Sequence, residues 1–173
     1  ENLSIDDIEA VGVGSPGSID SKNGVVVYTN NLNMENSKVG PMLSELLGGK
    51  KVYLDNDANV AAYGEYYING DNSESFVFIT LGTGVGGGVI INGNIYRGFN
   101  GAGGELGHII INMDGEQCTC GNKGCWEAYA SVTALVAQTK RAMENNPDSM
   151  MIKFAEEKGV VNGRTAFECA KKG

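Results

Sequence analysis

The stretch KKVYLDNDANVAAYGEYYING, from Lys50 to Gly70, sets the fold class of this chain. After two lysines, the residues Val52, Tyr53 and Leu54 run into the polar series Asp55, Asn56 and Asp57, which predicts a strand with polar groups at its C-terminal end. The residues that follow are rich in alanine and predict a helix. A strand that leads directly into a helix is the unit from which α/β proteins are built.

The same alternation is found nearer the N-terminus. Strands are predicted in IEAVGVGSPG (residues 8–17) and GVVVYTN (residues 24–30), because apolar or β-branched runs end there at Gly, Pro or Asn. In VGPMLSELLG (residues 39–48), the Met and Leu side chains share one helical face and Gly48 is a stop signal. This pattern predicts a helix.

The second half of the chain continues the pattern. Residues 75–98 predict a strand, a glycine-rich turn, a second strand, an Asn92-Gly93 turn and a third strand, since Asn-Gly between apolar runs is a strong hairpin signal. Residues 125–145 predict one or two helices that stop near Pro147, and short helices are expected at 149–157 and 165–171. The predicted class is therefore α/β with a mixed sheet.

Composition limits the kind of protein. The 173 residues suffice for one domain or for parts of two, and 42% hydrophobic with 20% charged residues is typical of a globular protein. No stretch approaches the roughly 20 apolar residues that cross a bilayer, and no leader opens the chain, so we expect a cytoplasmic protein without a membrane partner. The net charge of -8 argues against a nucleic-acid-binding surface in this chain.

Both ends of the chain suggest a fragment. It opens on Glu1 rather than Met and enters a predicted strand within ten residues. It closes on AFECAKKG (residues 166–173), which has the pattern of a helix end. We therefore expect these residues to be part of a larger protein.

Three of the four cysteines lie close to the single histidine. Cys118, Cys120 and Cys125 form a C-x-C-x4-C pattern ten residues after His108. This is the donor set of a closed Cys3His zinc site, and glycines between the cysteines permit the tight turns that direct successive thiolates at one centre. A disulfide would leave one cysteine unpaired and is not expected in a reducing compartment. With four protein ligands the zinc would be structural, not catalytic.

The turn LGTGVGGG (residues 81–88) joins two predicted strands. Its missing side chains let backbone N–H groups approach a phosphate, and the Thr83 hydroxyl adds a donor. The pattern is neither a Walker loop nor a dinucleotide fingerprint, which would open a helix. A plain β-hairpin that needs glycine for its turn is an equally good interpretation of these residues alone.

Acidic and amide side chains lie at the ends of predicted elements. Asn56 and Asp57 follow a strand, where open α/β sheets place ligand-binding groups. Asp57 is suited to be a general base, and a helix N-cap is the alternative. Metal binding would bring Glu105 and Glu127, which flank the cysteine cluster, near each other. Several carboxylates with an Asn suit a polyhydroxylated ligand such as a sugar.

Together these motifs resemble the ROK family of sugar kinases and repressors, and within it the bacterial glucokinases. The matching segments, in the family's order and approximate spacing, are GVGSPGSID, TNNLN, LDNDANVAAYGE, LGTGVGGGVIINGNIYRG, GAGGELGHI and CTCGNKGCWEAYAS. The combination of E-x-G-H with C-x-C-G-x2-G-C-x-E is highly specific. The resemblance covers nearly the whole chain and implies an actin-like, ribonuclease-H-like two-lobed sugar kinase fold, incomplete here, with a sugar cleft between the lobes.

The resemblance also implies how the lobes divide. Residues 1–58 would be the remainder of the smaller N-terminal lobe, and residues 59–173 part of the larger C-terminal lobe with the zinc loop. The family's first phosphate loop, a D-x-G-x-T element, is absent, and so is the C-terminal part that completes the adenosine site. We therefore expect this chain by itself to be inactive.

Each candidate residue acquires a role from the resemblance. Asp57 corresponds to the catalytic base, which takes the proton of the sugar 6-hydroxyl as that oxygen attacks the γ-phosphate of ATP. The sugar-binding positions correspond to Asn31, Asn56, Asp57, Glu105, His108 and Glu127. The loop that approaches the ATP phosphates contains Gly82, Thr83 and Gly84. The zinc ligands correspond to His108, Cys118, Cys120 and Cys125.

The implied activity is phosphorylation of a hexose, glucose first of all, by ATP with Mg²⁺, a transferase reaction of glycolysis and carbohydrate metabolism. The family implies a homodimer. The alternative is the sugar-sensing domain of a ROK repressor, which shares the zinc loop and carries a DNA-binding helix-turn-helix. The presence of Asp57, Glu105, His108 and Glu127 favours the enzyme. A zinc-stabilised structural module that binds no sugar is a third interpretation.

Overall fold

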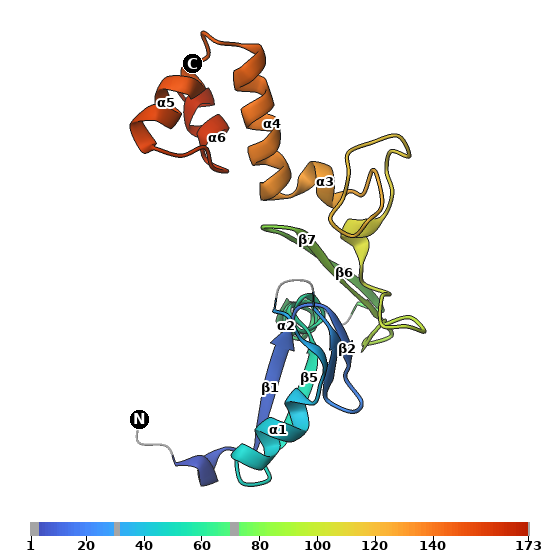
Figure 1. Ribbon diagram of the computed structural model, residues 1–173. Helices are drawn as coiled ribbons and strands as arrows, with labels where there is room; N and C mark the ends of the chain where they lie inside the picture. The colour runs from blue at the N-terminus through green and yellow to red at the C-terminus, as the bar shows by residue number, and fades with distance from the viewer. Residues whose placement is uncertain (1–3, 30–31, 70–72, 173) are drawn as a thin grey trace. The chain divides into compact units, whose positions relative to one another are not determined.

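The computed structural model describes residues 4–29, 32–69 and 73–172 (Figure 1). Two compact units are present: unit 1 is Glu1–Ile79 with Gly87–Glu105, and unit 2 is Thr80–Gly86 with Leu106–Gly173. The predicted lobe boundary, after residue 58, falls inside unit 1 and does not coincide with the division into these units. The division into lobes remains a prediction.

Unit 1 contains a parallel strand pair that carries the Asn56-Asp57 junction. Strand β1 (Ala10–Ser15) pairs with β5 (Lys51–Asn56) from Ala10 opposite Lys51 to Ser15 opposite Asn56. Helix α1 (Val39–Leu46) packs on β5, and helix α2 (Asp57–Asn69) packs on both strands. The parallel pairing places the C-terminal ends of both strands at one edge, where α2 begins.

Two further sheets lie next to this pair along the chain. Strands β2 (Ser18–Asp20), β3 (Val25–Tyr28) and β4 (Glu35–Ser37) pair antiparallel in sequence order. Strands β6 (Ser75–Leu81), β7 (Val85–Ile91) and β8 (Asn94–Ile95) form the third sheet in that order, with β7 and β8 antiparallel. Among the described residues, the parallel pair of β1 with β5 and the antiparallel pairs given above lie in different sheets, whereas the sequence predicted a mixed sheet.

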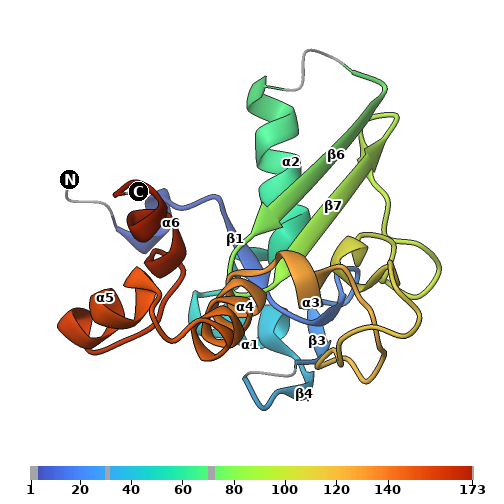
Figure 2. The same cartoon turned by 90° about the horizontal axis from the view of Figure 1, so that it is seen from above.

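Figure 2 shows α2 next to the strands β6 and β7, and the core of unit 1 lies where α2 contacts β7. A Cβ atom at Gly88 would lie 2.3 Å from the Cβ of Ala62, so only a glycine at position 88 permits this approach. Ala62 and Ile90 are fully buried. The turn between β7 and β8 has positive φ at both Asn92 and Gly93, as the Asn-Gly signal predicts.

Unit 2 is helical outside its turn and its cysteine loop. Its elements are the 3-10 turn η2 (Leu106–His108) and the helices α3 (Glu127–Ala130), α4 (Val132–Asn145), α5 (Met150–Lys158) and α6 (Thr165–Ala170). The Ser131 hydroxyl accepts a hydrogen bond from the Ala134 N–H at 3.0 Å and caps α4, which explains why the predicted helical stretch is two helices. Helix α3 packs on α4, and α5 packs on α6.

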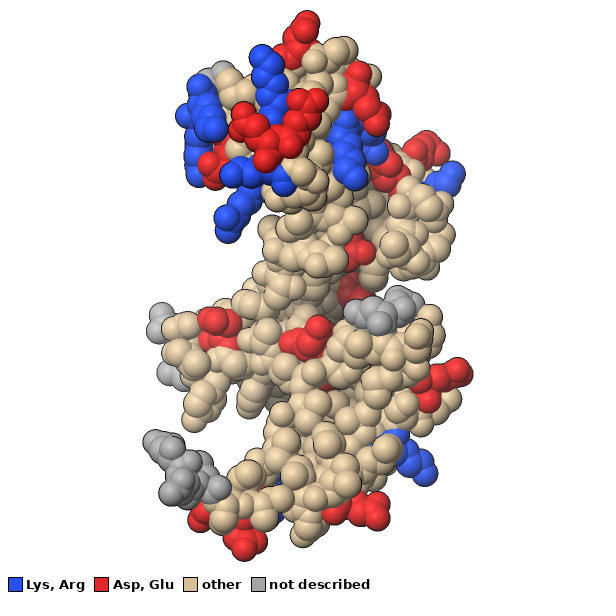
Figure 3. Space-filling view, turned by 60° about the vertical axis from the view of Figure 1, so that its left-hand side comes forward, with Lys and Arg blue, Asp and Glu red and all other residues tan. Residues whose placement is uncertain are grey.

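Seven of the 13 Lys and Arg residues lie between Val132 at the start of α4 and Lys172 after α6, and basic side chains gather on these helices among acidic ones in Figure 3. The ammonium groups of Lys158 and Lys172 lie 5.9 and 5.2 Å from the centroid of the Phe154 ring. The Lys158 contact lies within α5, and the Lys172 contact joins α5 to the residues that follow α6. No helix among the described residues is both long and apolar enough to span a membrane.

The local predictions hold for most elements. The short strands β2 and β4 and the 3-10 turns η1 (Ile5–Asp7) and η2 were not predicted. Each has only three residues, and the sequences of β2 and β4, SID and ENS, contain little β-propensity. Pairing with β3 is what makes these segments strands.

Candidate functional site

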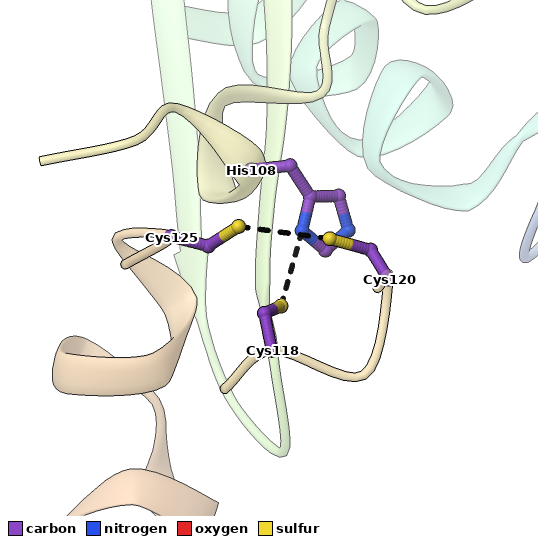
Figure 4. Close-up of side chains that lie close together, drawn as sticks. All are labelled: His108, Cys118, Cys120 and Cys125. Atoms are coloured by element: carbon purple, nitrogen blue, oxygen red, sulfur yellow. Dashed lines mark hydrogen bonds between the residues drawn. The ribbon is translucent and has the colours of Figure 1, made fainter. Parts of the chain in front are cut away.

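The predicted metal ligands meet in unit 2 (Figure 4). The ligand atoms of His108, Cys118, Cys120 and Cys125 all lie within 4.8 Å of one another. The His108 Nδ1 and Cys118 Sγ atoms are 3.7 Å apart, and the sulfurs of Cys120 and Cys125 are 3.6 Å apart. Zn–S bonds of about 2.3 Å in a tetrahedron place sulfurs about 3.8 Å apart. The four donors therefore fit a single zinc ion.

The loop that carries these cysteines is folded by its own backbone. The Cys118 N–H donates to the Asn122 carbonyl at 2.9 Å, and Gln117 Nε2 donates to three carbonyls of the same turn. Gly121 and Gly124 have positive φ, and a Cβ at Gly124 would lie 1.6 Å from the Asn112 carbonyl oxygen. The two glycines thus permit the turns that bring the thiols together.

The thiols of this cluster differ in acidity. Burial, together with the neighbouring thiols of Cys120 and Cys118, raises the pKa of Cys125 to about 12. Burial also raises the pKa of Cys120, but hydrogen bonds from the Asn122 backbone and from the other two thiols outweigh it and lower that pKa overall. Thiolates this close repel one another, and a bound dication would remove that repulsion.

Glu127 links the cysteine loop to the glycine-rich turn. Its Oε2 atom accepts a hydrogen bond from the Val85 N–H at 2.9 Å, and its Oε1 atom lies 3.9 Å from the Cys118 sulfur. A Cβ at Gly84 would lie only 2.3 Å from Glu127 Oε2, so the carboxylate occupies the space beside that glycine. The predicted sugar-binding glutamate is therefore in direct contact with the predicted phosphate loop.

The β5–α2 junction presents Asp57 to solvent. Asn56 precedes the helix, and its Oδ1 atom accepts hydrogen bonds from the Ala58 and Asn59 N–H groups at 2.9 and 3.2 Å. Asn56 is therefore the N-cap, while Asp57 is the first helical residue and is exposed. Asp57 Oδ1 also accepts from the Ala58 N–H. Because Asn56 already caps α2, the start of this helix does not require Asp57 as its N-cap.

Asp55, the residue before this pair, was not among the predicted site residues. Its carboxylate is nearly buried, and it forms an ion pair with Arg97. It also accepts hydrogen bonds from the Asn56 N–H and from Asn59 Nδ2. A cavity of about 710 Å³ in unit 1 is lined by Asp55 and Arg97 but not by Asn56 or Asp57. The sequence offers one sign of the Asp55–Arg97 ion pair, namely an acidic residue close to the candidate base Asp57.

The other predicted residues are placed as follows. Glu105 is an exposed residue of unit 1, at the end of a loop in which a Cβ at Gly104 would lie 2.8 Å from the Gly87 carbonyl oxygen. Asn31 lies outside the described residues. Asn56, Asp57 and Glu105 thus belong to unit 1, whereas the metal cluster, Glu127 and residues 82–84 of the glycine-rich turn belong to unit 2.

Comparison with known proteins gives consistent matches. A model of the ROK family matches residues 2–169. The chain is 39% identical over 166 residues to a glucokinase of Thermotoga maritima, covering 94% of this chain and 52% of that protein. It is 36% identical over 160 residues to the xylose repressor of Bacillus subtilis, covering 91% of this chain and 41% of that protein. A ROK family glucokinase from Streptomyces griseus, solved with glucose and AMPPNP, superposes with a TM-score of 0.80 at 36% identity over 96% of this chain and 55% of that one.

The fold and the Cys3His cluster define a protein of the class that contains sugar kinases and sugar-responsive repressors. The chain belongs to the ROK family. Its fold is the mixed α/β fold of ROK sugar kinases, as predicted. The chain spans about half the length of the curated relatives it matches, and these relatives divide between glucokinases and xylose repressors.

Proposed function

We propose that the protein containing this chain transfers the γ-phosphoryl group of ATP to the 6-hydroxyl of a hexose, with glucose as its substrate. One observation carries the proposal: Asn56 caps α2, which leaves the Asp57 carboxylate exposed at the C-terminal end of a parallel strand. That is a suitable place for a general base. The similarity to a glucokinase solved with glucose and AMPPNP supports the choice of substrates.

In the proposed reaction, Asp57 accepts the proton of the sugar 6-hydroxyl while that oxygen attacks the γ-phosphorus. The bond from the γ-phosphorus to the bridging oxygen breaks, and ADP leaves. Asn56, Glu105, His108 and Glu127 would bind the other sugar hydroxyls, since carboxylate and amide oxygens accept hydrogen bonds from O–H groups. The turn at Gly82–Gly84 would hold the phosphates, and Mg²⁺ would offset their charge.

Zinc has a structural part in this proposal. The four donors of the cluster close its coordination sphere, so the ion would act by pinning the loop of residues 108–125. Glu127 follows that loop directly and opens α3. The metal ligands would therefore hold Glu127 in place against Val85, and Asp57 would perform the proton transfer.

A sugar-sensing repressor is the second candidate function. Identities of 36–37% to xylose repressors of two Bacillus species favour it. In such a protein the same sugar-binding residues would report the ligand to a DNA-binding domain. A helix-turn-helix encoded upstream of Glu1 would favour this alternative over the kinase.

A coupled assay tests the proposal. The complete protein, supplied with MgATP and a panel of hexoses, should release ADP fastest with glucose. Calorimetry with glucose in the absence of nucleotide separates the alternatives. Sugar binding without turnover would favour the repressor, and the absence of both would leave a structural module as the remaining interpretation.

A further inference from the structure

The turn between β6 and β7 is held by the first residues of α4. The Val132 N–H donates to the Gly82 carbonyl at 2.8 Å, and the Thr133 hydroxyl donates to the Thr83 carbonyl at 2.7 Å. These contacts join residues that are 50 positions apart in the chain. None of the sequence patterns assigned a role to Val132 or Thr133.

The other side of the same turn is also held. The Val85 N–H donates to Glu127 Oε2 at 2.9 Å, and within the turn the Gly82 N–H donates to the Gly84 carbonyl at 3.0 Å. All of these residues belong to unit 2. The segment from Glu127 to Thr133 therefore contacts three successive peptide groups of the turn.

These contacts determine where two N–H groups point. In a trans peptide the C=O and the following N–H point in opposite directions. Because Val132 binds the Gly82 carbonyl, the Thr83 N–H faces away from α4. Because the Thr133 hydroxyl binds the Thr83 carbonyl, the Gly84 N–H also faces away from α4. Neither N–H forms a hydrogen bond with any residue in the described part of the chain.

The sequence of the turn does not by itself determine how its peptide groups are oriented. Glycine-rich peptides rotate at little steric cost, so the Thr83–Gly84 peptide group could equally present its carbonyl. A carbonyl oxygen repels a phosphate, whereas successive N–H groups on a turn attract one. Gly82 and Thr83 are exposed, so a ligand has access to this side of the turn.

We propose that Thr133, with the backbone N–H of Val132, is a positioning residue for the phosphates of the nucleotide. It holds the Thr83–Gly84 peptide group in the orientation that offers N–H groups to the anion. This inference rests on the proposed kinase function for the identity of the ligand. It assigns the start of α4 to the nucleotide site, whereas Glu127 from the same segment is assigned to the sugar.

The test compares three variants of the complete protein. Thr133→Val keeps the shape of the side chain and removes the hydroxyl, and Thr133→Ser keeps the hydroxyl. Thr139→Val is the matched control, because the Thr139 hydroxyl donates to the Leu135 carbonyl in the same helix and does not contact the turn. Loss of one neutral hydrogen bond corresponds to roughly a three- to tenfold change in a binding constant.

We expect Thr133→Val to raise the KM for ATP by about three- to tenfold, with the KM for the hexose unchanged within about twofold. Thr133→Ser should restore the wild-type KM, and Thr139→Val should leave both KM values at the wild-type level. An unchanged KM for ATP in Thr133→Val, or an equal rise in both KM values, would overturn the proposal.

A second measurement does not depend on turnover. Hydrogen exchange of the peptide that covers residues 80–86 should be faster in Thr133→Val than in the wild-type protein and in Thr139→Val.

If the wild-type protein phosphorylates no hexose, the dissociation constant of AMPPNP is measured in place of the KM for ATP. Weaker AMPPNP binding by Thr133→Val would then support the positioning role while the kinase proposal fails. Equal exchange, or no AMPPNP binding by the wild-type protein, would overturn the inference. If Thr133→Val fails to fold, Thr133→Ala takes its place in both measurements.

Discussion

Arg97 donates from both Nε and Nη2 to the same carboxylate oxygen of Asp55, with the Nε contact at 3.1 Å. The second carboxylate oxygen accepts from the Asn56 N–H at 2.8 Å. Arg97 follows β8, and Asp55 lies near the end of β5. The pair therefore fastens the segment that leads to Glu105 onto the junction that presents Asn56 and Asp57, all within unit 1.

We predict that Arg97→Met lowers the free energy of unfolding of the complete protein by about 1–2 kcal/mol, because the Asp55 side chain is only 11% exposed and loses its counter-charge. The Arg97 side chain is 41% exposed, so solvent screening keeps the loss below that of a fully buried pair. Urea denaturation measures it. Lys171→Met, which breaks the exposed Lys171–Glu168 pair, should change the stability by less than about 0.5 kcal/mol. Equal losses in both variants would contradict this interpretation.

Zinc content is the second prediction. Elemental analysis of the purified protein should find about one zinc per chain, and Cys120→Ser should release it, since three donors hold the ion less well than four. Hydrogen exchange should then quicken between residues 108 and 127. Cys169→Ser, which alters a buried cysteine of α6 away from the cluster, should keep its zinc. A folded protein without metal would show that the cluster has another purpose.

Substitutions of Asp57 and of Asn56 should have different effects, because Asp57 is the candidate base and Asn56 caps α2. Asp57→Asn should lower turnover by about 10²- to 10⁴-fold while the dissociation constant for glucose changes by only a few-fold. Asn56→Ala should instead destabilise the protein by about 1 kcal/mol, because Asn56 provides the cap of α2. Asp148→Asn, at an exposed position before α5, is the control and should leave turnover unchanged. Full turnover by Asp57→Asn would eliminate it as the base.

The glycines of the β6–β7 turn should differ in their tolerance of a side chain. Gly84→Ala places a Cβ atom 2.3 Å from Glu127 Oε2, so the carboxylate must move and give up the hydrogen bond from the Val85 N–H, which should cost about 1–3 kcal/mol of stability. Gly82→Ala meets no described atom within 4 Å and should cost less than about 1 kcal/mol. Thermal unfolding of the two variants gives the comparison. If Gly82→Ala were the more damaging, the contact between the turn and Glu127 would be wrong.

Local signals predicted most of the fold. The Asn92-Gly93 turn, the strand run ending at Asn56 and the glycine stop after α1 depend on neighbouring residues, so periodicity and turn chemistry found them. For residues 125–145 the sequence predicts one or two helices without deciding between them, because a serine inside a helical pattern is also tolerated. The strands β2 and β4 escaped prediction because pairing with β3, not propensity, makes them strands.

The sequence by itself determined the metal donors, the candidate base and the order of elements. These depend on residue type and short spacing: the cysteines lie within eight residues, and Asn56 and Asp57 are adjacent. Only the tertiary structure decided which groups support them. Arg97 lies 42 positions from Asp55, and Thr133 lies 50 positions from Thr83. No local pattern encodes such contacts, since each exists only after separate elements have packed together.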